Sequence, residues 1–93
     1  MIKSFRCKET AALFLDHICD RRWRGFESVA IRKLDMLDAA IRIEVLRLPP
    51  GNRLERLQGD REGQWSIRIN DKWRICFRWV NGDVEDVEIV DYH

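Results

Sequence analysis

The sequence lacks several features that would define its class at once. No apolar run approaches the roughly 20 residues that span a bilayer, and the first ten residues contain no apolar signal-peptide core. The three cysteines, Cys7, Cys19 and Cys76, are widely spaced and form no CxxC motif. An odd, scattered set predicts reduced thiols rather than a disulfide framework or a zinc site. We therefore expect a soluble cytoplasmic protein, with no membrane partner and no metal or other cofactor.

The chain also lacks repeats, low-complexity segments and the length for two domains. At 93 residues and 45% hydrophobic residues, it is long enough to bury one modest core. We therefore predict a single domain over residues 1–93.

Charge is distributed unevenly along the chain. The last thirteen residues, 81–93, carry five acidic side chains and no basic one, whereas residues 47–80 carry eight basic and four acidic side chains. All but one of those eight basic residues are arginine, whose planar guanidinium suits phosphate. A basic central segment in a nearly neutral protein favours a nucleic acid or another acidic partner.

Hydrophobic periodicity predicts helices in the first half and strands in the second. Helical spacing predicts helices over 8–19 and 27–41, and we interpret both apolar stripes as core packing, although Lys33 interrupts the second. The sequence LPPGN at 48–52 separates the two halves. Alternation predicts a first strand and four later ones, over 2–5, 53–58, 65–70, 73–80 and 84–93. The order β-α-α-β-β-β-β predicts an α+β fold in which two helices pack on a small, mainly antiparallel sheet.

The alternation also predicts strand register. Pairing Ile69 with Trp73 leaves a three-residue loop and sets Ile67 opposite Ile75, which keeps all apolar side chains on one face. For the last hairpin, Asn81-Gly82 is a two-residue turn signal, but that register sets Phe77 against Asp86. We therefore predict a three-residue loop over 81–83, with Phe77 opposite Val87, Ile75 opposite Ile89, and Gly82 or Asp83 in a left-handed conformation.

In this register the other face carries three arginines. Arg68 lies opposite Arg74, and Arg78 lies opposite Asp86. Like charges directly opposite destabilise a sheet, and a bound phosphate would remove the repulsion. We therefore interpret this face as an anion site, the alternative being a solvated surface with splayed arginines. Arg53 and Arg61 from the same basic segment are further candidates for phosphate contacts.

The sequence ends on Asp91, Tyr92 and His93, next to the strand that carries Arg74. In RNA the 2′-OH can attack the adjacent phosphate, which requires a base, an acid and a cation for the developing charge. His93 suits the acid or base role, Tyr92 could contact a base, and Asp91 could orient His93 or Arg74. The alternative is a frayed polar terminus without function.

The segment LQGDREGQWSIRINDKWRICFRW, followed by VEIVDYH, resembles the HigB-type toxins of bacterial toxin–antitoxin modules, in the RelE/ParE superfamily. The resemblance covers essentially the whole chain. It implies ribosome-dependent endonucleolytic cleavage of mRNA in the A site of the 70S ribosome, by 2′-OH attack without metal, and hence inhibition of translation. It also implies a HigA-type antitoxin with a helix-turn-helix domain, which inhibits the toxin and links it to operator DNA.

By position, the resemblance assigns the scissile phosphate to Arg74 and the catalytic end to Asp91, Tyr92 and His93. Some HigB toxins have a catalytic histidine where this sequence has Glu55, and a nearby lysine is replaced by Gln58. Glu55 could still act as a base, but phosphates repel a carboxylate, so we expect a slow endoribonuclease.

Two other functions stay open at the level of sequence. One is a non-enzymatic toxin of the ParE type, which binds DNA gyrase and would not need the terminal Tyr-His. The other is a scaffold that binds only its antitoxin and has weak or no nuclease activity.

Overall fold

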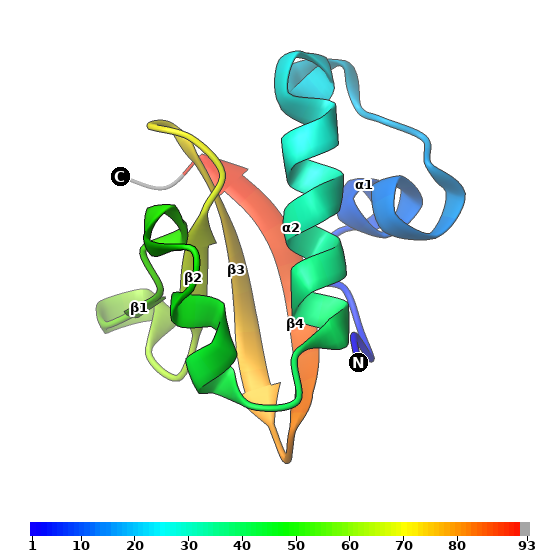
Figure 1. Ribbon diagram of the computed structural model, residues 1–93. Coiled ribbons are helices and arrows are strands. Elements are labelled where there is room, and N and C mark those ends of the chain that lie inside the picture. Colours follow the sequence, from blue (N-terminus) through cyan, green and yellow to red (C-terminus); the bar gives the residue numbers. More distant parts are fainter. Residues whose placement is uncertain (92–93) are drawn as a thin grey trace.

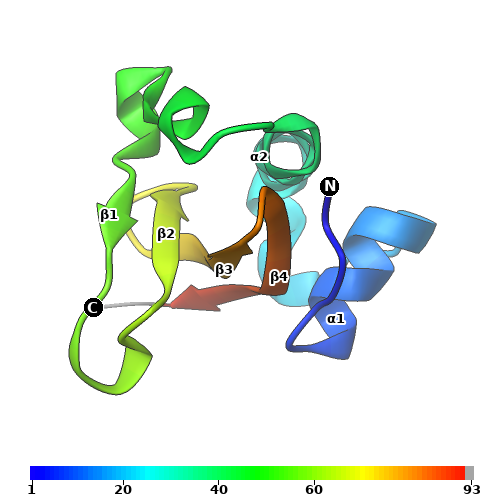
Figure 2. The same ribbon diagram turned by 90° about the horizontal axis from the view of Figure 1, so that it is seen from below.

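The structure, a computed structural model, describes residues 1–91 and contains a four-stranded antiparallel sheet in the order β1-β2-β3-β4 (Figure 1). Helix α2 covers one face of the sheet, and α1 lies beside the β4 edge (Figure 2). The predicted α+β architecture of two helices against a mainly antiparallel sheet is confirmed. The strands are β1 (Glu55–Arg56), β2 (Trp65–Arg68), β3 (Trp73–Val80) and β4 (Asp83–Asp91).

The core lies between α2 and the apolar face of the sheet. Leu34 and Leu37 of α2 and Ile67, Ile75 and Phe77 of the sheet are each 0% exposed. These are the side chains that the two periodicities place on facing surfaces, so the alternation sets which face of the sheet becomes the core.

The first helical segment is shorter and less regular than the predicted helix over 8–19. Helix α1 (Lys8–Ala11) continues into a π-helical turn (Ala12–Asp16), and His17 ends it in a left-handed conformation with φ 57°. A π turn adds a residue to the helical turn and rotates the side chains that follow it. Ile18, an apolar residue within the predicted helix, lies beyond this end and is 64% exposed.

Helix α2 (Glu27–Ala39) ends two residues before the predicted boundary at 41, because Ala40 adopts an extended conformation with ψ 127°. Ile41 consequently leaves the buried stripe and is 79% exposed. The helix is preceded by one 3-10 segment and followed by two that the periodicity did not predict: η2 (Arg21–Phe26), η3 (Ile43–Arg47) and η4 (Pro50–Asn52).

The predicted register of the first long hairpin is confirmed. Trp65 pairs with Phe77, and Ile67 pairs with Ile75. Strand β2 ends before the predicted boundary at 70, because the Asn70 side chain accepts hydrogen bonds from the backbone of the turn. The predicted strand over 53–58 shrinks to the two residues of β1.

The second hairpin has both the two-residue turn that Asn81-Gly82 indicates and the register of Ile75 with Ile89 that the apolar pattern predicts. Val80 pairs with Asp83, so the turn has two residues, Asn81 and Gly82, with φ 52° and 84°. The predicted three-residue loop over 81–83 is wrong. A β-bulge at Asp86, with φ 53°, inserts one residue into β4.

The bulge changes which residues pair on either side of it. Arg78 faces Glu85, not Asp86 as we predicted. Beyond the bulge, Ile75 faces Ile89, as the apolar pattern requires.

The predicted first strand over 2–5 forms only two isolated parallel bridges, Ile2 with Val84 and Phe5 with Val87. Short backbone contacts nevertheless hold this segment along the outer edge of β4. The hydrogen bonds run from Lys3 N to Val84 O, from Val84 N to Met1 O, from Arg6 N to Val87 O and from Val87 N to Ser4 O.

Candidate functional site

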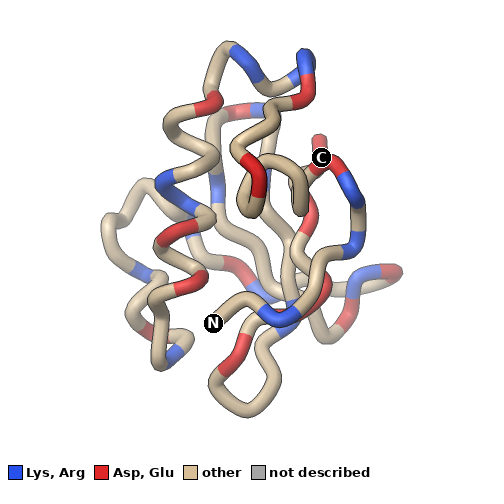
Figure 3. The backbone as a smooth tube through the Cα atoms, turned by 90° about the vertical axis from the view of Figure 1, so that its right-hand side faces the viewer, with Lys and Arg blue, Asp and Glu red and all other residues tan. Residues whose placement is uncertain are grey.

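The polar face of the sheet, on the side away from α2, carries Ser66 and Arg68 of β2 and Arg74 and Arg78 of β3. The register places Arg68 directly opposite Arg74, as predicted. Basic and acidic residues are interspersed over the rest of the chain (Figure 3), so these arginines are a local group rather than part of a wholly basic surface.

Arg74 is held by two neutral acceptors. Its Nε donates to Ser66 Oγ at 2.8 Å, and its Nη2 donates to the backbone carbonyl of Arg53 at 2.8 Å. The Arg74 side chain is 12% exposed, and Ser66 is fully buried. A hydroxyl and a carbonyl fix the orientation of the guanidinium without neutralising its charge, and three of its five N–H groups make no hydrogen bond within residues 1–91.

Glu55 of β1 lies close to the Arg74 guanidinium. Its Oε1 is 3.7 Å from Arg74 Nη2, and its side chain is 54% exposed. This distance is longer than a hydrogen bond, so the two residues form a loose ion pair between a largely buried guanidinium and a half-exposed carboxylate. The structure therefore brings together two of the residues predicted to be catalytic, with the carboxylate free to contact solvent.

Arg68 has a partner that the register alone does not reveal. Its Nη2 is hydrogen bonded to Asp71 in the β2–β3 turn. The neighbouring carboxylate lowers the repulsion between Arg68 and Arg74, so each arginine has its own acceptors within the chain.

Arg61, a candidate for a phosphate contact, has acceptors within the chain. Its Nη1 donates to Glu88 Oε1 at 2.7 Å and to Gln64 Oε1 at 3.1 Å. The side chains of Arg61 and Glu88 are 27% and 14% exposed. This half-buried ion pair joins the turn η5 (Gly59–Arg61) to β4.

The two other arginines predicted to bind phosphate are exposed. A Cβ on Gly63 would lie 3.7 Å from both Nη atoms of Arg78, so this guanidinium lies over the turn before β2. Arg53 has a left-handed backbone, with φ 46°, and it contacts Arg74 through its carbonyl.

The last described residue, Asp91, pairs with Trp73 at the end of β4, and its Oδ2 lies 3.6 Å from Lys72 Nζ. Directly opposite residues share a face, so Asp91 lies on the Trp73 face of the sheet and Arg74 on the other. Tyr92 and His93 are outside the described residues.

A protein-family profile described as "RelE-like toxin of type II toxin-antitoxin system HigB" matches residues 3–93. The chain belongs to this family. It is therefore a HigB-like toxin of a type II toxin–antitoxin system, and an antitoxin is its partner.

Individual relatives of this HigB-like toxin agree with the family match. The toxin HigB-1 of Vibrio cholerae is 46% identical over 67 residues, which cover 68% of this chain and 70% of that protein. The protein named endoribonuclease HigB from Proteus vulgaris is 35% identical over 105 aligned positions that cover both chains completely.

Solved structures support the fold of the HigB-like toxin. A YafQ variant from E. coli superposes with a TM-score of 0.60 at 15% identity, covering 98% of this chain and 91% of that one. A chain of the YoeB–YefM complex from Staphylococcus aureus gives a TM-score of 0.56 at 13% identity, covering 100% and 98%. At these identities the likeness concerns the fold alone.

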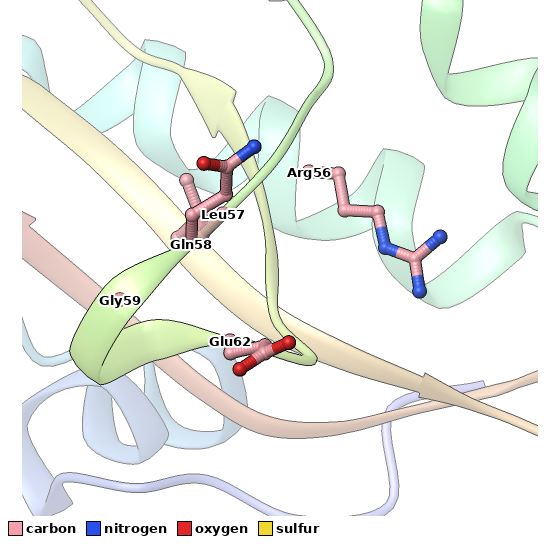
Figure 4. Close-up of a pocket in the computed structure, with 5 residues that line it drawn as sticks. All are labelled: Arg56, Leu57, Gln58, Gly59 and Glu62. Carbon is pink, nitrogen blue, oxygen red and sulfur yellow. The ribbon is translucent and has the colours of Figure 1, made fainter.

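A surface pocket of about 430 Å³ lies beside the site. It is lined by the segment from β1 through the following turn (Figure 4), namely Arg56, Leu57, Gln58, Gly59 and Glu62. Gln58, one of the two family departures, lies here. Of the predicted catalytic residues that the structure describes, Glu55, Arg74 and Asp91, none lines the pocket.

Two residues at the site escaped the sequence reasoning. Ser66 is the acceptor for Arg74 Nε, and the alternation already placed it on the arginine face of β2. Cys76, also on this face, is fully buried, and burial raises the pKa of its thiol to about 11.

Within residues 1–91 no three His, Cys, Asp or Glu side chains gather into a group that could hold a metal ion, and no helix there has the length and apolar character to cross a bilayer.

Proposed function

We propose that this toxin is a ribosome-dependent endoribonuclease that cleaves mRNA and so inhibits translation. The observation that carries the proposal is the geometry of Arg74, whose guanidinium is fixed by Ser66 Oγ and the Arg53 carbonyl, and whose other N–H groups have no hydrogen-bond acceptor among residues 1–91. Donors held in place before the reaction stabilise developing charge without reorganising. The relative from Proteus vulgaris, which is named an endoribonuclease, is similar over its whole length.

In the proposed reaction the 2′-OH of one nucleotide attacks the adjacent phosphate. The bond between that phosphorus and the 5′-oxygen of the next nucleotide breaks, which leaves a cyclic phosphate and a new 5′-OH. Arg74 contacts the charged phosphate oxygens, and Glu55 takes the proton of the 2′-OH. His93 is the candidate acid for the leaving oxygen, Tyr92 contacts a base, and Asp91 orients His93.

The identity of one proposed base predicts the rate. Glu55 lies 3.7 Å from Arg74, where a carboxylate repels an incoming phosphate. A histidine would not carry that negative charge, so we propose that this toxin is slow. The partners that we propose are mRNA in the A site of the 70S ribosome, in the cytoplasm, and a HigA-type antitoxin, through which the complex reaches operator DNA. The reaction needs no metal or cofactor in this scheme.

The test is primer extension on mRNA after brief expression of the wild type, of a variant without His93, and of Lys3→Gln. The last variant is a matched control, because Lys3 is exposed and lies next to Val84, at the other end of β4 from Asp91. We expect new 5′ ends within translated codons for the wild type and the control, and their loss without His93. Equal growth arrest without new ends in all three would instead favour the gyrase-binding type of toxin.

A further inference from the structure

Lys33 of α2 is a buried lysine whose side chain bonds to an amide. It is 6% exposed, and its Nζ donates to Asn52 Oδ1. Within residues 1–91 no acidic side chain forms an ion pair with it. Burying a charge is costly unless it is paired, so an apolar residue would serve packing better at this position.

The surroundings of Lys33 add to this cost. Burial lowers the pKa of its ammonium group, and the positive charges of Arg32 and Arg68 lower it further. The ammonium therefore lies in a field of its own sign. Stability alone does not account for a lysine here, whereas its hydrogen bond to Asn52 connects it to the candidate site.

The acceptor of that bond, Asn52, is itself fixed on all sides. It is fully buried, and its Nδ2 donates to the carbonyls of Leu46 and Leu48 at 3.1 and 3.2 Å. These bonds orient the amide so that Oδ1 faces Lys33. The Lys33–Asn52 bond thus joins α2 to the 3-10 segment η4, which periodicity in the sequence does not position.

The next residue along the chain reaches the candidate site. Arg53 follows Asn52 in a left-handed conformation, with φ 46° and ψ 56°, which is uncommon for a residue with a side chain. In this conformation its carbonyl accepts the hydrogen bond from Arg74 Nη2 at 2.8 Å. A shift of the Asn52 backbone would move this carbonyl with it.

We infer that Lys33 is a positioning residue for Arg74, acting through Asn52 and the Arg53 carbonyl. The contacts run from α2 through η4 to β3: two are direct hydrogen bonds, and Asn52 and Arg53 between them are neighbours in the chain. Its role in cleavage rests on the proposed nuclease function. The geometric claim, that Lys33 sets the orientation of the Arg74 guanidinium, does not.

The first experiment measures that geometry without any activity. The Nε–H cross-peak of Arg74 is assigned in a ¹H–¹⁵N spectrum by its loss in Arg74→Lys, and its hydrogen exchange is measured in Lys33→Met and in Arg32→Met. Methionine matches the length of lysine without its charge or donors. Arg32 is the matched control, because it is the exposed neighbour on the same helix. We expect the Arg74 cross-peak to shift and to exchange about tenfold or more faster in Lys33→Met only.

The second experiment measures cleavage of ribosome-bound mRNA at saturating toxin. Misplacement of a positioned group lowers the maximal rate, so we expect a loss of about 10- to 100-fold in Lys33→Met with little change in the half-saturating concentration. In an Arg74→Ala background the same substitution should change nothing further, because the group that it positions is absent. A merely structural role would lower activity in both backgrounds.

The outcomes separate the two proposals. If the wild type does not cleave mRNA but the Arg74 cross-peak responds to Lys33→Met alone, the nuclease proposal fails and the positioning role stands. If Lys33→Met folds and leaves the cross-peak unchanged, the positioning role is overturned. If Lys33→Met does not fold, Lys33→Gln, which keeps an N–H donor but no charge, takes its place and is judged by the same cross-peak.

Discussion

Replacing Arg74 with lysine tests whether the site depends on charge or on geometry. Both side chains are cationic, so Arg74→Lys keeps the electrostatic attraction for RNA. Lysine carries its three donors on one nitrogen at the end of a flexible stem, whereas arginine holds five donors in a plane. The variant therefore keeps the positive charge and removes the fixed orientation of the donors.

The size of the effect follows from the contacts. Lysine cannot reproduce both 2.8 Å bonds that fix the guanidinium, to Ser66 Oγ and to the Arg53 carbonyl. Losing one preoriented donor to a developing oxyanion costs about 100- to 1,000-fold in rate, so we expect a fall of about 100-fold. Ser66 is fully buried and loses its donor, which lowers the free energy of unfolding by about 1 kcal/mol.

The assay is single-turnover cleavage with ribosomes programmed with a defined mRNA. Saturating toxin isolates the cleavage step, and a titration gives the half-saturating concentration, which we expect to stay within a few-fold of the wild type because the charge is kept. Arg42→Lys is the control for the same exchange, because Arg42 is an exposed arginine that follows α2 and lies outside the site. Circular dichroism melting checks that each variant is folded.

A clear result would refute this reasoning. If Arg74→Lys cleaves within threefold of the wild type and melts normally, a fixed guanidinium is not what stabilises the transition state. A large rise in the half-saturating concentration with an unchanged maximal rate would assign Arg74 to ribosome binding instead.

Two further predictions concern the polar face. Glu88→Gln replaces the acidic partner of Arg61 in a half-buried pair at 2.7 Å, so we expect about 2 kcal/mol less stability and a Tm lower by roughly 10 °C. In contrast, Asp71→Asn, whose side chain is 100% exposed, should change stability by less than about 0.5 kcal/mol; equal effects in melting experiments would contradict this. Cys76 is buried with a pKa of about 11, above the usual 9.0, so at pH 9–10 it stays a protonated, unreactive thiol in the folded protein. Iodoacetamide followed by peptide mass spectrometry should label Cys7 first and Cys76 only after unfolding, and equal labelling rates would count against burial of the Cys76 thiol.

The register of the sheet was predictable where alternation decides it. Trp65 and Ile67 alternate with polar residues, and so do Ile75 and Phe77, so a single pairing keeps all four on one face. The same argument placed Arg68 opposite Arg74. A pleated strand has a period of two residues, and any slip would move a whole apolar set into water.

Irregular insertions were not predictable from the same period. The turn signal at Asn81-Gly82 indicates a two-residue loop, whereas the apolar pattern predicts a three-residue loop over 81–83. The chain satisfies both by inserting Asp86 as a bulge. Likewise, the π turn over Ala12–Asp16 changes the helical phase, which leaves Leu15 64% exposed although its spacing indicates burial.

The site was predictable in part. Parity along β3 identified Arg74 and its face. The groups that contact Arg74 were not predictable. Arg53 follows a 3-10 segment and Glu55 lies in a two-residue strand, and neither segment shows a hydrophobic periodicity. Lys33 was visible as the one charged interruption of an apolar stripe, but core packing explained the stripe as a whole and gave no reason to consider that residue alone.

The N-terminal segment along β4 also determines how a partner can bind the sheet. An exposed edge strand offers unpaired backbone groups to which another chain can add a strand. Here the backbone of residues 1–6 bonds to Val84 and Val87, and the Thr10 hydroxyl accepts from Ile89 N. On the opposite edge, β1 has only two residues. A protein that binds this toxin along β4 must therefore contact side chains rather than add a strand to the sheet. Removal of the first six residues would expose the backbone of β4 and allow two copies of the chain to pair through it.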